Sequence, residues 1–408
     1  ALLGLVEAAS PVQAVEVVAS ELARVTGAHE VSFLIADFSG DTLIRLPVAG
    51  DGIVAAGDEE LERLPLAGSV QAQALRSQQL RIVEEDGTMR LHAPVTDRGE
   101  AIGILELSLP SPPGDDLVRF VTAAAHALSY VVIANRRHTD LFERGQRNLP
   151  FSLAAEIQRR LLPEAFTCEA AEFTVAGWLE PASEVGGDTF DYCVERDLLH
   201  LSISDAKGHT VHAAQLATLA VSSLRNSRRS QASVAEQAVA ASEAIQEHAG
   251  EEDFVSALLL RVMLSSGEVT AVNAGHPTPH LVRDGVVSVV DLSADLPFGM
   301  MPGSGYTEQA VTLHPGDRLI LLTDGILERN ATTLDVAEAL QEMTDLHPRE
   351  VVHAFARAVL EETGGNLQDD ATLLCLDWYG PQAGDGGRRA RAGASQRRAS
   401  DADAPTTA

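Results

Sequence analysis

The sequence predicts an α+β protein with two domains, a helical connector and a C-terminal tail. Its 408 residues are more than one hydrophobic core usually organises, since domains hold roughly 100–200 residues. Hydrophobic residues make up 45% of the chain, as in globular proteins. Strand-like apolar runs alternate irregularly with segments of helical spacing in both halves. We therefore place the domains at residues 1–113 and 163–379, the connector at 114–162 and the tail at 380–408.

The first domain begins with an amphipathic helix over residues 12–25, which we expect to end near Gly27. The other predicted elements are strands 30–37 and 42–48, a helix over 68–76, and strands 80–84, 91–95 and 101–109. Residues 38–41 and 97–100 carry turn signals, so each of these segments is predicted to close a β-hairpin.

The connector follows the Pro- and Gly-rich boundary at residues 110–114, with a long helix predicted over 115–144. Its apolar residues alternate steps of four and three, like a heptad seam: Leu117, Val121, Ala124, Leu128 and Val131. A seam of this kind packs on its twin, which predicts a homodimer. A surface amphipathic helix is the alternative, because the run is shorter than three or four heptads. After Pro150 a short helix presents Leu153, Ile157 and Leu161 on one face.

In the second domain the periodicity predicts helices over 213–227, 231–248, 334–343 and 348–362, and strands over 257–263, 269–274, 278–283, 286–292, 317–323 and 371–378. Four segments bring aspartates to strand ends: Asp188 in GGDTFD, Asp205 in SDAKGH, Asp324 in LLTDGILE, and Asp369 with Asp370 in DDATLL. A single such aspartate usually caps a turn or a helix. Four of them without basic partners would repel one another, and a divalent cation reverses that repulsion.

The aspartates therefore predict a site for two hard cations. Oxygen ligands without a Cys/His cluster favour Mg²⁺ or Mn²⁺ over zinc. Two such ions activate a water and neutralise charge on a phosphoryl group, which is the chemistry that phosphomonoester hydrolysis requires. Asp191 is a weaker candidate ligand, and capping a turn is its alternative role. Lys207 is expected to face solvent rather than hold phosphate.

In the order GGDTFD, SDAKGH, NAGHP, LPFGM, LLTDGILE and DDATLL, residues 152–378 resemble the SpoIIE/RsbU-like branch of the PPM (PP2C-type) serine/threonine phosphatases. The resemblance implies two antiparallel sheets flanked by helices. It further implies that Asp205 bridges two ions, that the Ala206 carbonyl and Asp188 (directly or through water) complete one of them, and that Asp324 and Asp369 hold the other. Asp369 is preferred to Asp370 because the first acid matches the motif's ligand position.

Two positions depart from the family pattern. Thr210 stands where the family has a second glycine, and Thr189 where it usually has an aromatic residue. Neither is a predicted metal ligand, so we expect activity to survive.

The first domain, with APVTDRGEAIGILELSL at residues 93–109, resembles a GAF domain. GAF domains commonly bind small molecules or dimerise as signal inputs, so the resemblance implies a small-molecule or protein input. Its histidines His29, His92 and His126 are more often surface or hydrogen-bonded residues than haem ligands.

The net charge of −29 argues against nucleic acid or an anionic membrane as the main partner. No uninterrupted apolar run reaches the ~18–20 residues that span a bilayer. The chain begins without Met or a basic leader, which predicts a truncated or processed chain with no signal peptide. Three widely spaced cysteines favour a reducing cytoplasm. The tail, residues 380–408, carries five arginines and no apolar period, which predicts disorder.

Together these features predict a cytoplasmic sensor-phosphatase with a GAF-like input and a Mn²⁺- or Mg²⁺-dependent output. By the family resemblance its substrate is a phosphoserine or phosphothreonine on an anti-sigma-factor antagonist, a STAS-domain protein of bacterial stress or developmental signalling. Two alternatives remain at this point: a two-metal enzyme acting on small phosphoesters, and a non-catalytic signalling module. The presence of all four aspartates favours catalysis.

Overall fold

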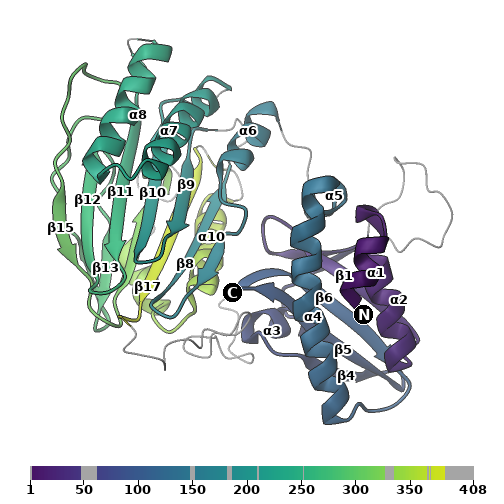
Figure 1. Cartoon of the computed structure of the whole chain (residues 1–408). Helices are drawn as coiled ribbons and strands as arrows, with labels where there is room; N and C mark the ends of the chain where they lie inside the picture. The colour runs from purple at the N-terminus through teal and green to yellow at the C-terminus, as the bar shows by residue number, and fades with distance from the viewer. Residues whose placement is uncertain are drawn as a thin grey trace. The chain divides into compact units, whose positions relative to one another are not determined.

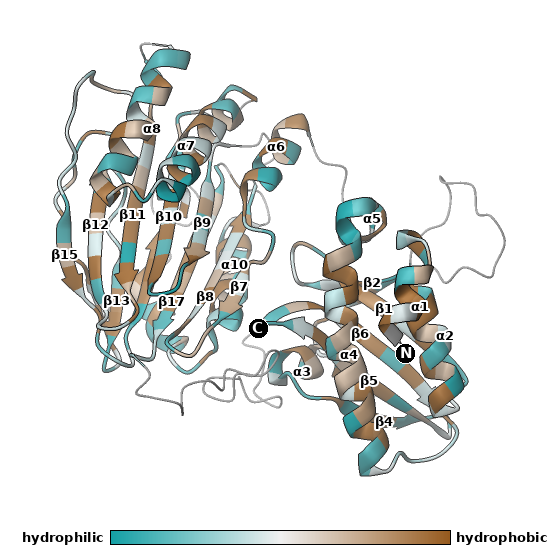
Figure 2. Ribbon diagram, in the orientation of Figure 1, coloured by the Kyte–Doolittle hydropathy of each residue, from teal (hydrophilic) through white to brown (hydrophobic). Residues whose placement is uncertain are grey.

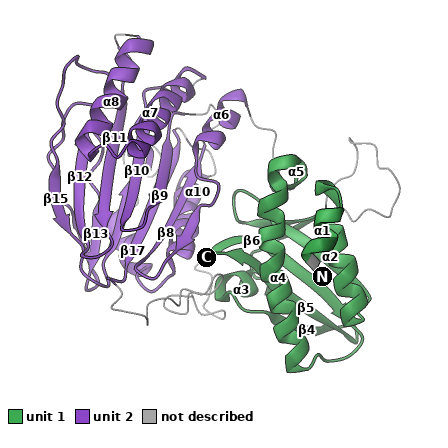
Figure 3. Cartoon of the chain, in the orientation of Figure 1, with its two compact units in different colours: residues 1–150, 390–408 green, residues 151–389 purple. Residues whose placement is uncertain are grey.

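The computed structural model describes residues 2–46, 62–147, 152–181, 186–208, 211–250, 252–326, 335–364, 367 and 369–381. The chain divides into two compact units near residue 150 (Figure 3). Predictions concerning Thr210 and almost all of the tail lie outside the described residues.

The first unit is built on a six-stranded antiparallel sheet of order β3-β2-β1-β6-β5-β4. The strands are β1 (Glu30–Ala36), β2 (Thr42–Arg45), β3 (Arg63–Pro65), β4 (Arg81–Glu85), β5 (Thr88–Asp97) and β6 (Glu100–Leu109). Both predicted hairpin turns join neighbouring antiparallel strands. The sequence analysis missed β3, a three-residue strand that ends in a proline.

Helices cover both faces of this sheet (Figure 1). α1 (Leu2–Ala8), α2 (Ala14–Thr26) and α4 (Asp115–Asn135) share a core with one face, and α3 (Val70–Ser77) packs on the other. α2 ends, as predicted, at Gly27, whose φ of 70° favours glycine. α5 (Leu141–Gln146) buries Phe142 against the core that α2 and α4 share.

α4 differs from the connector that the sequence predicted. It stops at Asn135, and Val121, Leu128 and Val131 of the expected seam are buried in the core of the first unit. Over five turns, a stripe that packs on a sheet and a coiled-coil seam have nearly the same spacing, so periodicity could not separate them. The expected seam is therefore not available for pairing with a second copy.

In the described part of the chain, residues 115–138 are the one helical stretch long and apolar enough to cross a membrane, with a mean hydropathy of 1.7. The core helix of a soluble protein passes the same test. The sequence analysis found no uninterrupted apolar run because Thr122, His126 and Ser129 interrupt this one without adding charge.

The second unit contains two antiparallel sheets, of order β15-β12-β11-β10-β9 and β14-β13-β16-β17-β8-β7. The strands are β7 (Thr167–Glu169), β8 (Phe173–Glu180), β9 (Thr189–Val194), β10 (Leu198–Ala206), β11 (Val255–Met263), β12 (Glu268–Ala274), β13 (His280–Arg283), β14 (Val286–Val289), β15 (Gln309–Thr312), β16 (Arg318–Leu322) and β17 (Ala371–Trp378). The sequence analysis missed β7, β8, β9 and β15. In β8 the glycine at position 177 weakens the strand signal.

The two sheets pack face to face, and helices cover both outer faces. α7 (Val211–Arg229) and α8 (Val234–His248) lie on the sheet that contains β11, while α9 (Val336–Glu342) and α10 (Pro348–Glu362) lie on the other. Alternate residues of β11 serve the two layers: Leu258 and Leu260 face the core between the sheets, and Ala257 and Leu259 face the helices. This arrangement confirms the predicted two-sheet sandwich flanked by helices.

Local sequence sets where these helices begin. The Ser233 side chain accepts a hydrogen bond from the Glu236 backbone, and the Glu236 carboxylate accepts one from the Ser233 backbone, which starts α8 with a capping box. α6 (Leu153–Leu161) starts at Ser152, whose side chain accepts from the Ala155 amide. α6 and α7 are in contact.

Gly177 is needed for the two sheets to pack. A Cβ at this position would lie 2.3 Å from the ring of Phe190, which enters from the opposite sheet. We predict that Gly177→Ala lowers the free energy of unfolding by about 1–3 kcal/mol, the usual cost of overpacking, measured by urea denaturation. Gly305→Ala, where a Cβ meets nothing within 4 Å, is the control and should change stability by less than about 0.5 kcal/mol.

Candidate metal centre

The predicted aspartates gather where four strands of the two sheets end. Asp188 directly precedes β9, and Asp205 lies near the end of β10, which pairs with β9 through Ser204 and Thr189. Asp324 follows β16, and Asp369 precedes β17; these strands pair through Leu322 and Leu373. The strand pairing thus places two aspartates at the ends of neighbouring strands in each sheet.

Asp188 joins the two sheets at this edge. The residue is 3% exposed, and its Oδ2 accepts hydrogen bonds from Thr323 Oγ1 and Thr372 Oγ1, both at 2.7 Å. The aspartate belongs to one sheet and both threonines to the other. The sequence analysis did not select these threonines, although each stands in one of the aspartate motifs.

The electrostatic environment of Asp188 disfavours its charged form. Burial first, and then the negative charges of Asp205 and Asp370, raise the pKa of Asp188 well above its ordinary value, and the two threonine hydrogen bonds oppose this only in part. A cation beside these carboxylates would reverse the effect.

Asp370 and Asp369 have different environments. Asp370 is 1% exposed, and its carboxylate accepts from the Gln158 side chain at 2.6 Å and from the Gly186 amide at 3.0 Å. Asp369 is half-buried, and its Oδ1 accepts from the Asp370 amide at 3.0 Å. Both oxygens of Asp370 thus bond protein donors, whereas Asp369 is more accessible. This contrast supports Asp369 as the ligand.

Glycines leave room for these close approaches. A Cβ at Gly187 would lie 2.5 Å from the carbonyl oxygen of Ala206, and one at Gly186 would lie 2.6 Å from the Asp370 carboxylate. At Gly325 a Cβ would fall 1.9 Å from the Asp370 carbonyl oxygen. Backbone and carboxylate oxygens are thereby packed together where the ligands were predicted.

Gln158 connects α6 to this group of residues. Its Nε2 donates to Asp370 Oδ2 at 2.6 Å and to the Asp188 carbonyl at 2.9 Å, and the residue is 2% exposed. The sequence offered no reason to select Gln158, because a glutamine on a helix gives no sign of a partner more than two hundred residues away.

The donor chemistry fits hard cations. Asp188, Asp205, Asp324, Asp369 and the Ala206 carbonyl offer oxygen only, the ligand type that Mg²⁺ and Mn²⁺ prefer. In the described ranges no group of three or more His, Cys, Asp or Glu side chains is arranged so that it could hold a metal ion. Asp205, Asp324 and Asp369 are half-buried.

Other residues considered in the sequence have structural roles. Asp191 lies within β9 and forms ion pairs with Arg225 at 2.9 Å and Arg228 at 3.1 Å, so it caps no turn. The Lys207 side chain is exposed and donates to the Glu252 carbonyl at 2.8 Å. His276 is buried, and its amide donates to the Asn273 side chain at 2.8 Å, which shapes the NAGHP loop. Burial lowers the pKa of His276 to about 3.

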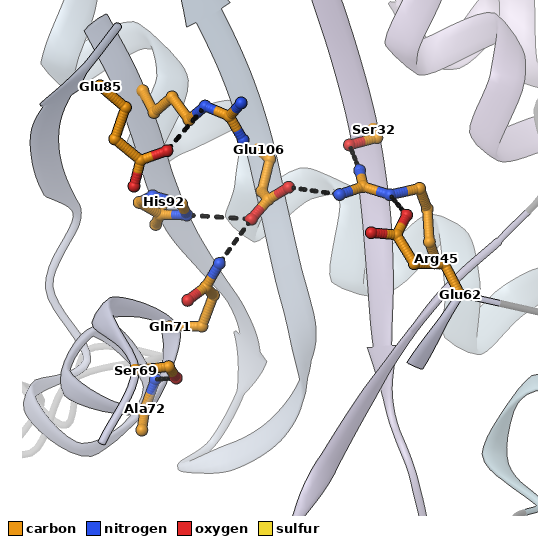
Figure 4. Close-up of polar contacts among 10 residues, drawn as sticks. Ser32, Arg45, Glu62, Ser69, Gln71, Ala72, Glu85, His92 and Glu106 are labelled. Atoms are coloured by element: carbon orange, nitrogen blue, oxygen red, sulfur yellow. Dashed lines mark hydrogen bonds and ion pairs between the residues drawn. The ribbon is translucent and has the colours of Figure 1, made fainter. Parts of the chain in front are cut away.

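The first unit contains a separate buried polar network (Figure 4). Glu106 accepts from Arg45 at 3.1 Å and Gln71 at 2.9 Å, and its other contact is His92 Nδ1 at 3.1 Å. Burial alone would raise the pKa of Glu106, but the hydrogen bonds of His92 and Gln71 and the neighbouring positive charges lower it to about 2. The hollow beside Ser32 and Arg45 measures about 10 Å³, room for about one water.

Of the three histidines considered as haem ligands, His92 contacts Glu106, His126 Nδ1 lies 3.1 Å from the Thr96 carbonyl, and His29 is exposed. These three histidines therefore lie in three different environments.

Comparison with protein families assigns both units. Residues 195–379 match the family described as Stage II sporulation protein E (SpoIIE), and residues 10–132 match the GAF domain. The chain carries a GAF domain followed by a SpoIIE-family phosphatase domain. The SpoIIE match includes Asp205, Asp324 and Asp369, and the GAF match includes most of α4, which agrees with its place in the first unit.

Individual relatives are distant. Protein IcfG of Synechocystis sp. (strain ATCC 27184 / PCC 6803 / Kazusa) is 23% identical over 266 residues, which cover 57% of this chain and 42% of IcfG. The match thus spans about two fifths of that relative's length. Among solved structures, the RsbU and RsbW domains of Rv1364c from Mycobacterium tuberculosis are 27% identical, with a TM-score of 0.47 over 52% of this chain and 61% of that one. The SiaA-PP2C domain of Pseudomonas aeruginosa is 22% identical, with a TM-score of 0.47 over 55% and 93%.

We predict opposite effects of Asp188→Asn without and with metal. Because the folded-state pKa of Asp188 is raised, its ionisation makes the metal-free fold less stable as pH rises above the ordinary value. The metal-free variant should therefore be more stable than the parent chain at pH 8 and gain less at pH 4. The stabilisation by Mn²⁺ should fall in the variant. Thermal denaturation at both pH values, with and without Mn²⁺, measures this.

The control for that experiment is Asp284→Asn, in the turn between β13 and β14. It should leave both the pH dependence and the Mn²⁺-induced shift unchanged. A metal-free Asp188→Asn chain that is less stable than the parent at pH 8 would contradict the electrostatic account.

We also predict that Gln158→Ala costs about 1–3 kcal/mol of stability, because it removes a donor from the buried Asp370 carboxylate. As Gln158 orients a neighbour of the predicted ligands, the Mn²⁺ concentration for half-maximal thermal stabilisation should rise about 10–100-fold. Gln341→Ala on α9, an exposed glutamine, should change neither quantity. An unchanged Mn²⁺ dependence in Gln158→Ala would leave Gln158 with a purely structural role.

Proposed function

We propose that this chain is a Mn²⁺- or Mg²⁺-dependent protein serine/threonine phosphatase controlled by its GAF domain. The observation that carries the proposal is the cluster of Asp188, Asp205 and Asp370, of which Asp205 and Asp370 lie within the residues that match the SpoIIE family. Repulsion between these carboxylates lowers the stability of the fold. Cations bound beside them would relieve that repulsion and neutralise charge on a phosphoryl group.

In this proposal two ions would be held by oxygen ligands. Asp205 would serve both ions, the Ala206 carbonyl and Asp188 would serve one of them, and Asp324 and Asp369 would serve the other. When bound, the ions supply an activated water and neutralise charge on the phosphoryl oxygens. The reaction then needs no side chain as nucleophile. The buried Ser204 hydroxyl lies 2.7 Å from that of Thr189, which agrees with a structural role for this serine.

Regulation by the GAF domain is proposed to act through α6. This helix is the first element of the second unit, and its Gln158 contacts both Asp370 and the Asp188 backbone. A shift of α6 would therefore change the surroundings of the predicted metal ligands. A small molecule or a protein is proposed as the input to the GAF domain.

The proposed substrate is a phosphoserine or phosphothreonine on an anti-sigma-factor antagonist of the STAS type. The RsbU-like motifs support this choice, and the net charge of −29 disfavours a nucleic-acid substrate. A cytoplasmic location is also part of the proposal, supported by Cys168, Cys193 and Cys375, which form no disulfide in the described part of the chain.

We predict that the full chain hydrolyses p-nitrophenyl phosphate with Mn²⁺ but not with EDTA. Asp205→Asn should reduce turnover at least about 100-fold, because it alters the proposed bridging ligand, a larger change than the loss of a residue behind a ligand. Asp284→Asn is the control and should keep full turnover. Steady-state rates of the three chains at matched Mn²⁺ concentrations provide the measurement.

A second assay separates the substrate classes, with a phosphorylated STAS-domain protein and a phosphoserine peptide as substrates. Hydrolysis of p-nitrophenyl phosphate alone would favour an enzyme of small phosphoesters. Metal-independent turnover, or turnover that Asp205→Asn retains, would overturn the proposed site.

A further inference from the structure

The core between the two sheets of the second unit ends in polar side chains at the edge where the aspartates gather. Figure 2 shows hydrophobic colouring along much of β11, where Leu258 and Leu260 face this core and Ser256 is the next residue on the same side. On β10, Asp205 follows Ile203 in the same way. Ser256 and Asp205 are direct cross-strand partners, so their side chains lie next to each other on one face of the sheet.

His276 reaches Ser256 from the loop that follows β12. The chain turns at Gly275, whose φ of 70° favours glycine, and a backbone bridge to Ala257 holds this loop along β11. His276 is 4% exposed, and its Nδ1 lies 2.9 Å from Ser256 Oγ. The ring therefore takes its partner from the residue that pairs with Asp205.

The same ring also lies beside the second sheet. The carbonyl of Leu322, the last residue of β16, opposes the lowering of the His276 pKa by burial. Nε2 of the ring is buried, and among the described residues no acceptor bonds it in good geometry. Directly after Leu322 come Thr323, which donates to Asp188, and Asp324. His276 thus lies against both sheets, close in the chain to the proposed ligands of each.

We propose that His276 is a positioning residue of the metal centre, whose ring holds Ser256 of one sheet next to the Leu322 carbonyl of the other. Ser256 pairs with Asp205, and Leu322 stands two positions before Asp324. The ring thereby sets the separation between the strand ends that carry these two proposed ligands. This inference rests on the proposed two-metal site and adds a residue to the shell behind its ligands.

A neutral ring suits this role better than a charged group. The hydrogen bonds from Thr323 and Thr372 to Asp188 also connect the sheets, but a cation bound to that carboxylate would compete with them. Burial lowers the pKa of His276 to about 3, so the ring carries no charge at neutral pH and its contacts do not oppose a cation. A ring with so low a pKa is also unsuited to exchanging protons in a reaction at neutral pH.

The alternative is that His276 serves only its own loop. Its amide donates to the Asn273 side chain at 2.8 Å, and this bond does not involve the ring. If the ring had no further role, replacing it would lower stability and leave the Mn²⁺ requirement unchanged. The two roles therefore differ in a measurable quantity other than stability.

A Mn²⁺ titration of thermal stability in the full chain tests the proposal with Ser256→Ala and His276→Leu. Each should raise the Mn²⁺ concentration for half-maximal stabilisation about tenfold or more, as expected for groups behind metal ligands. Ser256→Ala removes only a hydroxyl, so it remains informative if His276→Leu fails to fold. His280→Leu on β13, a half-buried histidine whose pKa is also lowered by burial, is the matched control and should leave this concentration unchanged.

The double variant tests whether the two residues act through their contact. If they do, Ser256→Ala should add almost nothing to the effect of His276→Leu, because neighbours that act together are not additive. Effects that multiply fully would overturn the contact as the cause.

The outcomes separate this inference from the proposed function. Parent-like Mn²⁺ dependence in both single variants would overturn the role of His276 and leave the metal-dependent phosphatase intact. A parent chain that Mn²⁺ does not stabilise would overturn the two-metal site and this inference with it. The pH profile of p-nitrophenyl phosphate turnover should keep its shape in His276→Leu. Loss of one limb of that profile would assign proton transfer to His276 and overturn the positioning role.

Discussion

The buried carboxylate of Asp188 is the constraint on which the arrangement of the second unit depends. The carboxylate accepts hydrogen bonds from Thr323 and Thr372 of the opposite sheet. One side chain thus connects the strand ends of the two sheets. Two hydroxyl donors satisfy one of its oxygens without neutralising its charge. The fold thus accepts an electrostatic cost at the place where the other aspartates gather.

The electrostatic cost at Asp188 connects the stability of the fold with the proposed binding of metal ions. The raised pKa of Asp188 reflects its burial and the carboxylates of Asp205 and Asp370. Glycines at positions 186, 187 and 325 allow the surrounding backbone to approach these groups closely. A site assembled only for stability would place a basic side chain there, as the structure does at Asp191 with Arg225 and Arg228. The difference between these two aspartates is the strongest physical argument for a cation beside Asp188.

α4 shows the limit of periodicity as evidence. Its apolar residues were read as a dimer seam, and the structure buries them under the sheet of the GAF domain instead. The spacing itself was observed correctly, but a helix of this composition has more than one apolar face. Only the position of the sheet shows which face of the helix is buried.

The sequence by itself determined the α+β class and most of the longer elements, because strands and helices carry distinct periods. It also selected the aspartates that are proposed as metal ligands, because ligand chemistry requires acids. Only the tertiary structure decided that Gln158 bonds Asp370 and that Thr323 and Thr372 bond Asp188. Those partners are separated by 135 to 212 positions along the chain. The physical reason is that local propensity acts over a few residues, whereas a buried polar group takes its partner from whatever the packing of distant strands and helices brings within reach.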